Sequence, residues 1–108
     1  MKNTAEQKHE YCPIEESSKL IGDFWSLMII RKLLEGKLRF NELEEMLDNI
    51  TGSTLSSKLK RLIEQGLVER TQYQCIPPKV EYSLTAKGLD LKPLIAEVET
   101  FGRKWLER

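Results

Sequence analysis

The segment formed by residues 24–34 restricts the possible folds most strongly. Its sequence is FWSLMIIRKLL, and a helix built from it would carry apolar side chains on nearly every side. Such a helix is stable only when other elements cover most of its surface. Gly36 follows the segment, and glycine readily adopts the left-handed conformation found just past many helix ends. The sequence therefore predicts a central buried helix around which the chain packs.

The chain has 108 residues, enough for one compact domain with a modest core. Its 40% hydrophobic and 31% charged residues are ordinary for a globular protein, which excludes the disordered, collagen-like and membrane classes. The longest aliphatic run covers only residues 27–30, and the N-terminus lacks the apolar core of a signal peptide. We expect a cytoplasmic protein that does not bind membranes, with a flexible polar arm over residues 1–11 and a single domain over residues 12–108.

The charge balance and the small number of possible metal-binding residues argue against several further classes of protein. Seventeen basic residues balance seventeen acidic ones, so only a local basic patch could support nucleic-acid binding. Cys12 and Cys75 are too few for a disulfide framework and are expected to be free thiols. With His9 as the single histidine, a zinc site would need carboxylates to complete it, and we expect neither a metal nor a cofactor. The chain also lacks a glycine-rich phosphate loop and an oriented nucleophile, so we do not expect an enzyme.

Besides the central helix, three more helices are predicted before the strand-favouring residues that follow Gly66. Residues 14–22 can form a short helix behind a polar lead. Asn41 and Glu44 have the spacing of a capping box and begin a second short helix, with apolar residues at Leu43, Met46 and Leu47. After a tight turn over residues 48–50, Thr51 caps a longer helix that ends at Gly66. The buried stripe of this longer helix consists of Leu55, Leu59, Leu62 and Ile63.

A hairpin and a final helix complete the chain. Residues 67–73 and 80–84 favour strands, and Pro77 and Pro78 lie between them in a long tip. Thr85 can cap a final helix over residues 86–107, with Pro93 inside it as a kink. Its apolar positions recur every three or four residues at Leu91, Leu94, Ile95, Val98, Phe101 and Trp105.

A short helix, a tight turn, a longer helix and a hairpin form the pattern of a winged helix-turn-helix, in a mainly α fold with a small β-hairpin wing. The alternative is a helical bundle with an incidental hairpin. The exposed side of the helix over residues 51–66 favours the first interpretation, because small hydroxyls and bases suit entry into a DNA groove. A merely solvated face is the competing explanation. The candidate DNA-binding residues on this helix are Ser53, Thr54, Ser57, Lys58, Lys60 and Arg61.

The hairpin adds two candidate DNA contacts, Arg70 and Lys79, which could reach phosphates or the minor groove. An ordinary exposed hairpin explains these residues equally well. The helix before the tight turn is acidic, with Glu42, Glu44 and Glu45. An acidic face would oppose DNA, so we expect it to face solvent or a partner. A second hypothesis follows: a winged helix that docks a basic protein without sequence-specific DNA binding.

Longer segments of the chain match a known family. The segment CPIEESSKLIGDFWSLMIIRKLLEGKLRFNEL is followed by TLSSKLKRLIEQGLVER and PPKVEYSLTAKG. These segments, which extend from Cys12 to about Trp105, resemble the HxlR-type winged helix-turn-helix transcriptional regulators of bacteria, relatives of the MarR family. The resemblance implies a homodimer that binds double-stranded DNA at an inverted-repeat operator. It places the recognition helix on residues 53–65 and the wing on residues 70–82.

The resemblance also implies that the N- and C-terminal helices form the dimer interface. The apolar stripe of residues 86–107 agrees, with packing on the protein's own core as the alternative. The residues concerned are Leu94, Ile95, Val98, Phe101 and Trp105.

Several family members use the cysteine of the Cys-Pro start as a sensor of oxidants or electrophiles, and Cys12 occupies that position. A helix start favours a thiolate, whereas Glu15 and Glu16 oppose it. Cys75 is the only other thiol, and an inert Cys12 is the alternative. No residue pattern marks a small-molecule effector beyond the groove between the terminal helices and the core.

Overall fold

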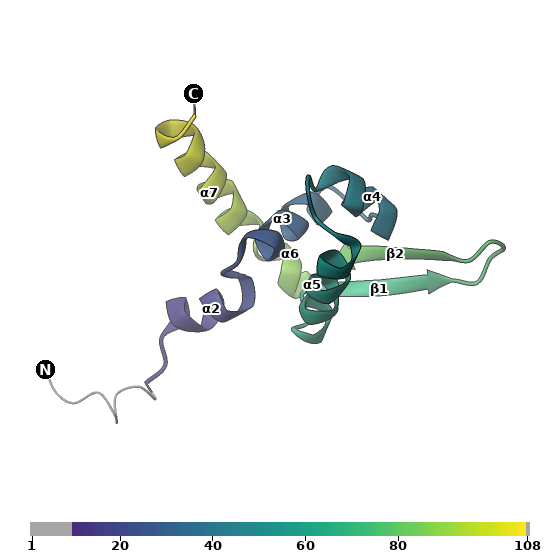
Figure 1. The fold of residues 1–108 in the computed structure, drawn as a ribbon. Helices are drawn as coiled ribbons and strands as arrows, with labels where there is room; N and C mark the ends of the chain where they lie inside the picture. Colours follow the sequence, from purple (N-terminus) through teal and green to yellow (C-terminus); the bar gives the residue numbers. More distant parts are fainter. Residues whose placement is uncertain (1–9, 108) are drawn as a thin grey trace, which may run out of the picture.

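The computed structural model describes residues 10–107, so most of the arm predicted over residues 1–11 lies outside the described part. The hairpin lies at one end of the molecule and the two terminal helices, α2 and α7, at the other, with α3, α4 and α5 between them (Figure 1). The elements, in chain order, are α2 (Pro13–Ile21), α3 (Phe24–Leu33), α4 (Phe40–Met46), α5 (Gly52–Glu64), β1 (Val68–Tyr73), β2 (Lys79–Leu84), α6 (Ala86–Leu89) and α7 (Lys92–Trp105).

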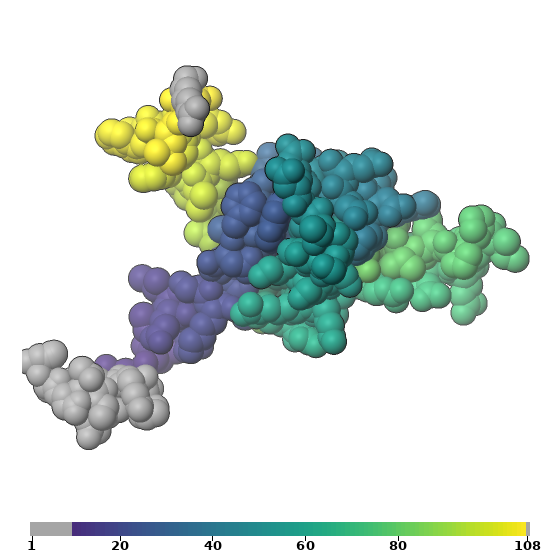
Figure 2. Space-filling model, in the orientation of Figure 1, coloured from purple at the N-terminus to yellow at the C-terminus, as the bar shows by residue number. Residues whose placement is uncertain are grey.

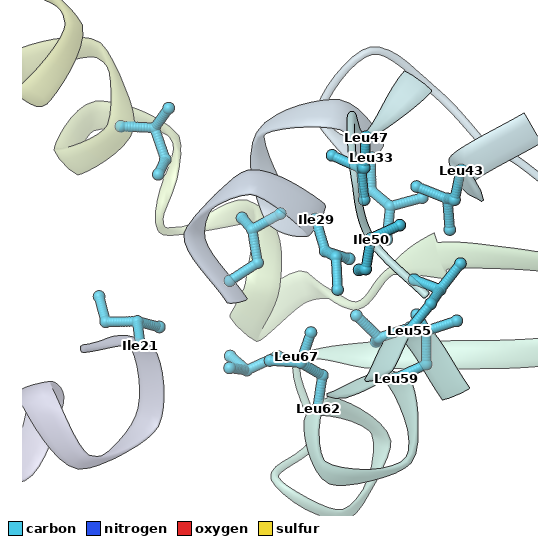
Figure 3. Close-up of a cluster of buried hydrophobic side chains, with 13 residues drawn as sticks. Ile21, Ile29, Leu33, Leu43, Leu47, Ile50, Leu55, Leu59, Leu62 and Leu67 are labelled. Atoms are coloured by element: carbon cyan, nitrogen blue, oxygen red, sulfur yellow. The ribbon is translucent and has the colours of Figure 1, made fainter. Parts of the chain in front are cut away.

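The central helix predicted over residues 24–34 is confirmed as α3. Ile29 and Ile30 are completely buried, and they pack with the leucines of α4 and α5 in one hydrophobic cluster (Figure 3). Asp23 begins the helix, since its carboxylate accepts hydrogen bonds from the Ser26 N–H at 3.0 Å and the Ser26 hydroxyl at 2.7 Å. Only the first turn departs from the prediction, because Phe24 is exposed.

The predicted capping box at Asn41 and Glu44 is wrong. α4 begins at Phe40, and a Glu42 carboxylate oxygen accepts a hydrogen bond from the Arg39 N–H at 2.7 Å. An acid at the third helical position satisfies the free N–H at the helix start, and Glu42 does this two residues earlier than expected. The turn to α5 is as tight as predicted, and the Thr51 hydroxyl caps α5 by accepting a hydrogen bond from the Thr54 N–H at 3.1 Å.

The hairpin is antiparallel, with pairs that run from Val68 opposite Leu84 to Tyr73 opposite Lys79. A further bridge joins it to the loop before α4, where Leu38 and Tyr82 exchange backbone hydrogen bonds of 3.0 and 2.8 Å. A bridge of one residue has no alternating pattern, so the sequence carried no signal for it.

The single helix predicted over residues 86–107 is wrong, because the structure has two helices there. Thr85 caps only α6, its hydroxyl accepting a hydrogen bond from the Gly88 N–H at 3.1 Å. Pro93 lies in the first turn of α7, where its missing N–H would have no helical partner, so it starts a helix instead of kinking one. Among residues 10–107, no helix is long and apolar enough to cross a membrane.

Candidate DNA-binding surface

The outer side of α5 carries the small polar residues that the sequence analysis singled out. Leu55, Leu59 and Leu62 are buried against the core, which fixes the opposite side of the helix toward solvent. At 100° per residue, the outermost strip contains Ser53, Ser57 and Lys60, all of them exposed, together with Glu64. The strip therefore offers hydroxyls near the start of α5 and a base in its middle.

A groove of about 250 Å³ separates α5 from the hairpin. Lys60 lines it from the helix and Arg70 from β1, so the fold brings together two bases ten positions apart in the sequence. Ser56, Glu64 and Tyr82 also line this groove, and Ser56 and Tyr82 were not among the predicted site residues. The strand pairing could have identified Tyr82, since it lies directly opposite Arg70.

The two predicted wing bases lie on opposite faces of the hairpin. Arg70 pairs with Tyr82 and Lys79 with Tyr73, and side chains three positions apart on one strand point to opposite faces. The Lys79 ammonium lies 4.9 Å from the centre of the Tyr73 ring and 3.8 Å from the Glu81 carboxylate. Only Arg70 therefore faces the groove beside α5.

Two other bases of α5 contact the junction between α2 and α3. Arg61 donates a hydrogen bond through Nη2 to the backbone oxygen of Lys19 at 2.7 Å. The Lys58 ammonium lies 3.4 Å from the Asp23 carboxylate. Burial raises the pKa of Asp23, but hydrogen bonds from Ser26 and Lys58 outweigh that effect and lower the pKa below its ordinary value.

Thr54 is half-buried on the same helix, and its hydroxyl oxygen accepts a hydrogen bond from the Thr51 hydroxyl at 3.0 Å. Its polar group thus belongs to the cap of α5. The predicted DNA-binding residues on α5 are accordingly of three kinds: an outward strip, a pair of bases at the α2–α3 junction, and a capping hydroxyl.

The predicted dimer residues divide in a similar way. Ile95 is 5% exposed and belongs to the core. Figure 2 shows α7 in yellow and α2 in purple standing apart from the body of the molecule. An apolar groove of about 440 Å³ runs between these two helices, lined by residues that include Ile14, Leu94 and Val98. The exposed members of the predicted interface are Leu94, Val98, Phe101 and Trp105, which are 42–66% exposed.

Both cysteines are free. Cys12 precedes α2 and is half-buried, whereas Cys75 is exposed in the hairpin tip. The start of α2 and the hairpin tip lie at opposite ends of the molecule (Figure 1). A disulfide needs the two Cα atoms within about 7 Å of each other, so these two thiols cannot join within one folded chain.

A short helix, a tight turn and a second helix, with an antiparallel hairpin directly after them, define a winged helix-turn-helix protein. In this class the second helix of the pair enters the major groove of DNA. A family model described as HxlR-like helix-turn-helix matches residues 20–108, and the chain belongs to this family. It is a transcriptional regulator of the HxlR/MarR winged-helix type.

Individual relatives agree with this assignment. The chain is 38% identical over 99 residues to the HTH-type transcriptional regulator YdeP of Bacillus subtilis (strain 168), covering 92% of this chain and 77% of YdeP. It is 45% identical over 93 residues to the HTH-type transcriptional regulator BH0655 of Halalkalibacterium halodurans, covering 85% and 82% of the two chains. Among solved structures, the redox regulator HypR in its oxidized form superposes with a TM-score of 0.84 at 35% identity. That match covers 90% of this chain and 100% of HypR.

Proposed function

We propose that this protein binds an inverted-repeat operator as a homodimer in the cytoplasm and regulates transcription from it, without enzymatic activity or a cofactor. The groove between α5 and the hairpin carries the proposal, because it brings Arg70 of the hairpin beside Lys60, which shares the outward strip of α5 with the hydroxyls of Ser53 and Ser57. Bases on both walls of this groove suit the phosphates of one DNA backbone, which would pass between α5 and the hairpin while α5 lies in the major groove. Lys79, on the other hairpin face, contributes less.

The homodimer uses the exposed apolar residues of α7 together with α2. A stripe of four large apolar side chains on one helix, beside an apolar groove, is more than a small monomer normally leaves in water. A second copy would cover the same patch on both chains around a two-fold axis. Two α5 helices would then enter successive major grooves, with half-site centres roughly 34 Å apart or at a multiple of that spacing.

Cys12 gives the regulator its response to oxidants. Support comes from its position at the start of α2, beside Pro13 of the α2–α7 groove, and from the similarity to HypR, a redox regulator. Diamide joins two thiols into a disulfide and takes up their two hydrogen atoms. Because Cys75 lies too far away, the second thiol must come from another chain or from a small thiol. Operator affinity that diamide leaves unchanged in wild type would contradict this role, with Cys12→Ser as the matched control.

The first experiment selects duplexes from a randomised pool over repeated rounds of binding to the purified protein. We expect the pool to converge on an inverted repeat with half-sites one or more DNA turns apart. A pool that does not converge would contradict the proposed function. It would then favour the alternative, a module that docks a basic protein through the acidic face of α4.

The second experiment measures the affinity for the selected duplex as a function of salt concentration. Each lost phosphate contact reduces the slope of log affinity against log salt by about 1. We expect this reduction for Lys60→Met and for Arg70→Met. Lys92→Met, on α7 away from the hairpin, is the control and should keep the wild-type slope. Unchanged slopes for both groove variants would show that DNA does not use this groove.

A further inference from the structure

We infer that Lys58 and Arg61 are positioning residues. They hold α5 in the orientation needed for DNA binding by fixing it to the junction between α2 and α3. We call the four residues involved, Lys19, Asp23, Lys58 and Arg61, the junction clamp. The inference rests on the proposed function, since it concerns how α5 is presented to an operator. It assigns these two bases a role different from the DNA contact that their place in the sequence indicates.

The first half of the clamp is the contact of Arg61 with the end of α2. Lys19 lies in the last turn of α2, where backbone oxygens have no partner within the helix. Arg61 Nη2 donates to the Lys19 oxygen at 2.7 Å, and its positive charge suits the negative end of the helix dipole. The guanidinium therefore caps α2 from the side of α5 and points toward the protein.

The second half of the clamp is the ion pair of Lys58 with Asp23. Asp23 is already held by the Ser26 N–H and hydroxyl at the start of α3, so its carboxylate has a defined position. The side chain of Lys58 is only 26% exposed, and its ammonium lies 3.4 Å from that carboxylate. One acid thus joins the start of α3 to the middle of α5.

The junction itself has little freedom. Ile21 is buried in the core, and a Cβ on Gly22 would lie 2.4 Å from the Ser18 backbone oxygen. Lys58 and Arg61, one helical turn apart on α5, hold the two sides of this tight junction. A displacement of α2, whether at Cys12 or in the groove that α2 forms with α7, would therefore reach α5 through the clamp as well as through the core that Ile21 shares with α5.

Whether Asp23→Asn tightens or weakens DNA binding shows if Lys58 positions α5 or contacts DNA. If Lys58 bound a phosphate, the neighbouring Asp23 carboxylate would repel the DNA, and Asp23→Asn would tighten binding. If Lys58 positions α5 through Asp23, the same substitution weakens binding. Asparagine is as good a helix cap as aspartate, so the start of α3 is retained in this variant.

The test measures the affinity for the selected duplex and its salt slope in full-length variants. These are Asp23→Asn, Lys58→Met, Arg61→Met and the double variant that combines Asp23→Asn with Lys58→Met. We expect about three- to fivefold weaker binding for each single variant, the wild-type salt slope, and a double variant no weaker than either single variant. Lys58→Arg, which retains the ion pair, should restore wild-type affinity. Glu15→Gln removes an exposed carboxylate of α2 outside the clamp and should not weaken binding.

A second measurement needs no DNA. Amide hydrogen exchange over residues 18–23 should be faster in Lys58→Met and Arg61→Met than in wild type, and unchanged in Glu15→Gln. Tighter DNA binding by Asp23→Asn would overturn the clamp. So would a salt slope reduced by about 1 in Lys58→Met and Arg61→Met, or wild-type exchange rates in these two variants. Failure of the wild type to select any duplex would instead overturn the proposed function, on which the clamp's role in DNA binding rests.

Discussion

Arg31 on α3 forms an ion pair with Glu99 on α7, and the same guanidinium lies 2.9 Å from the Glu35 carboxylate. The hydrogen bond from Arg31 is the main cause that holds the pKa of Glu35 below its ordinary value. α7 otherwise meets the body mainly through the buried Ile95. The pair between Arg31 and Glu99 therefore fixes the direction in which α7 leaves the core, and with it the placement of the apolar stripe.

Loss of this pair should destabilise the protein slightly. Both side chains are 35% exposed, so solvent screens their attraction. We expect Glu99→Gln to lower the free energy of unfolding by about 0.5–1 kcal/mol, as measured by urea denaturation. Glu97→Gln, at an exposed position of the same helix, is the control, and an equal loss in both variants would argue against a specific role for the pair.

The apolar stripe of α7 should control the oligomeric state. Val98→Asp places a carboxylate in the proposed interface, where burying an unpaired charge is costly, so we expect monomers in sedimentation equilibrium. Thr100→Asp adds the same charge on the other side of α7 and should leave the dimer intact. A dimer that withstands Val98→Asp with unchanged affinity would place the interface elsewhere.

Substitution by alanine should destabilise the protein at Gly88 and stabilise it at Gly102. A Cβ on Gly88 would lie 2.3 Å from the Leu67 backbone oxygen, whereas a Cβ on Gly102 would meet nothing within 4 Å. We expect Gly88→Ala to cost about 1–3 kcal/mol of unfolding free energy, because α6 must move away from the chain before β1. Gly102→Ala, inside α7, should gain about 0.5–1 kcal/mol. Thermal and urea unfolding of both variants measure this, and a harmless Gly88→Ala would show that α6 packs more loosely.

Asp23 should contribute stability that depends on pH. Its pKa in the folded protein is lowered, so its contribution is fully present above its unfolded pKa of about 3.9. The contribution is lost as the pH falls through the lower folded pKa, when the carboxyl group protonates. Wild type should therefore exceed Asp23→Asn in unfolding free energy at neutral pH, and this difference should shrink in acid. A difference that stays constant from neutral pH down to strong acid would contradict the assignment.

The local patterns of the sequence determined the elements and their order. Leucines at positions 55, 59 and 62, the cap at Thr51 and the alternation after Gly66 each depend on hydrogen bonds and burial within a few residues. For this reason α4, the tight turn, α5 and the hairpin were all predictable. The predicted helix boundaries were wrong where two local signals compete. Glu42 and Glu44 are both able to complete a capping box, and a proline such as Pro93 either kinks a helix or begins one.

The tertiary structure alone decided what each exposed base faces. Lys58, Lys60 and Arg61 are near neighbours on one helix, yet only Lys60 faces the groove beside the hairpin, while the other two contact the α2–α3 junction. Strand pairing likewise separates Arg70 from Lys79. The physical reason is that an apolar stripe specifies which side of an element is buried. The partner of a charged side chain at the edge of that stripe depends instead on how distant segments pack.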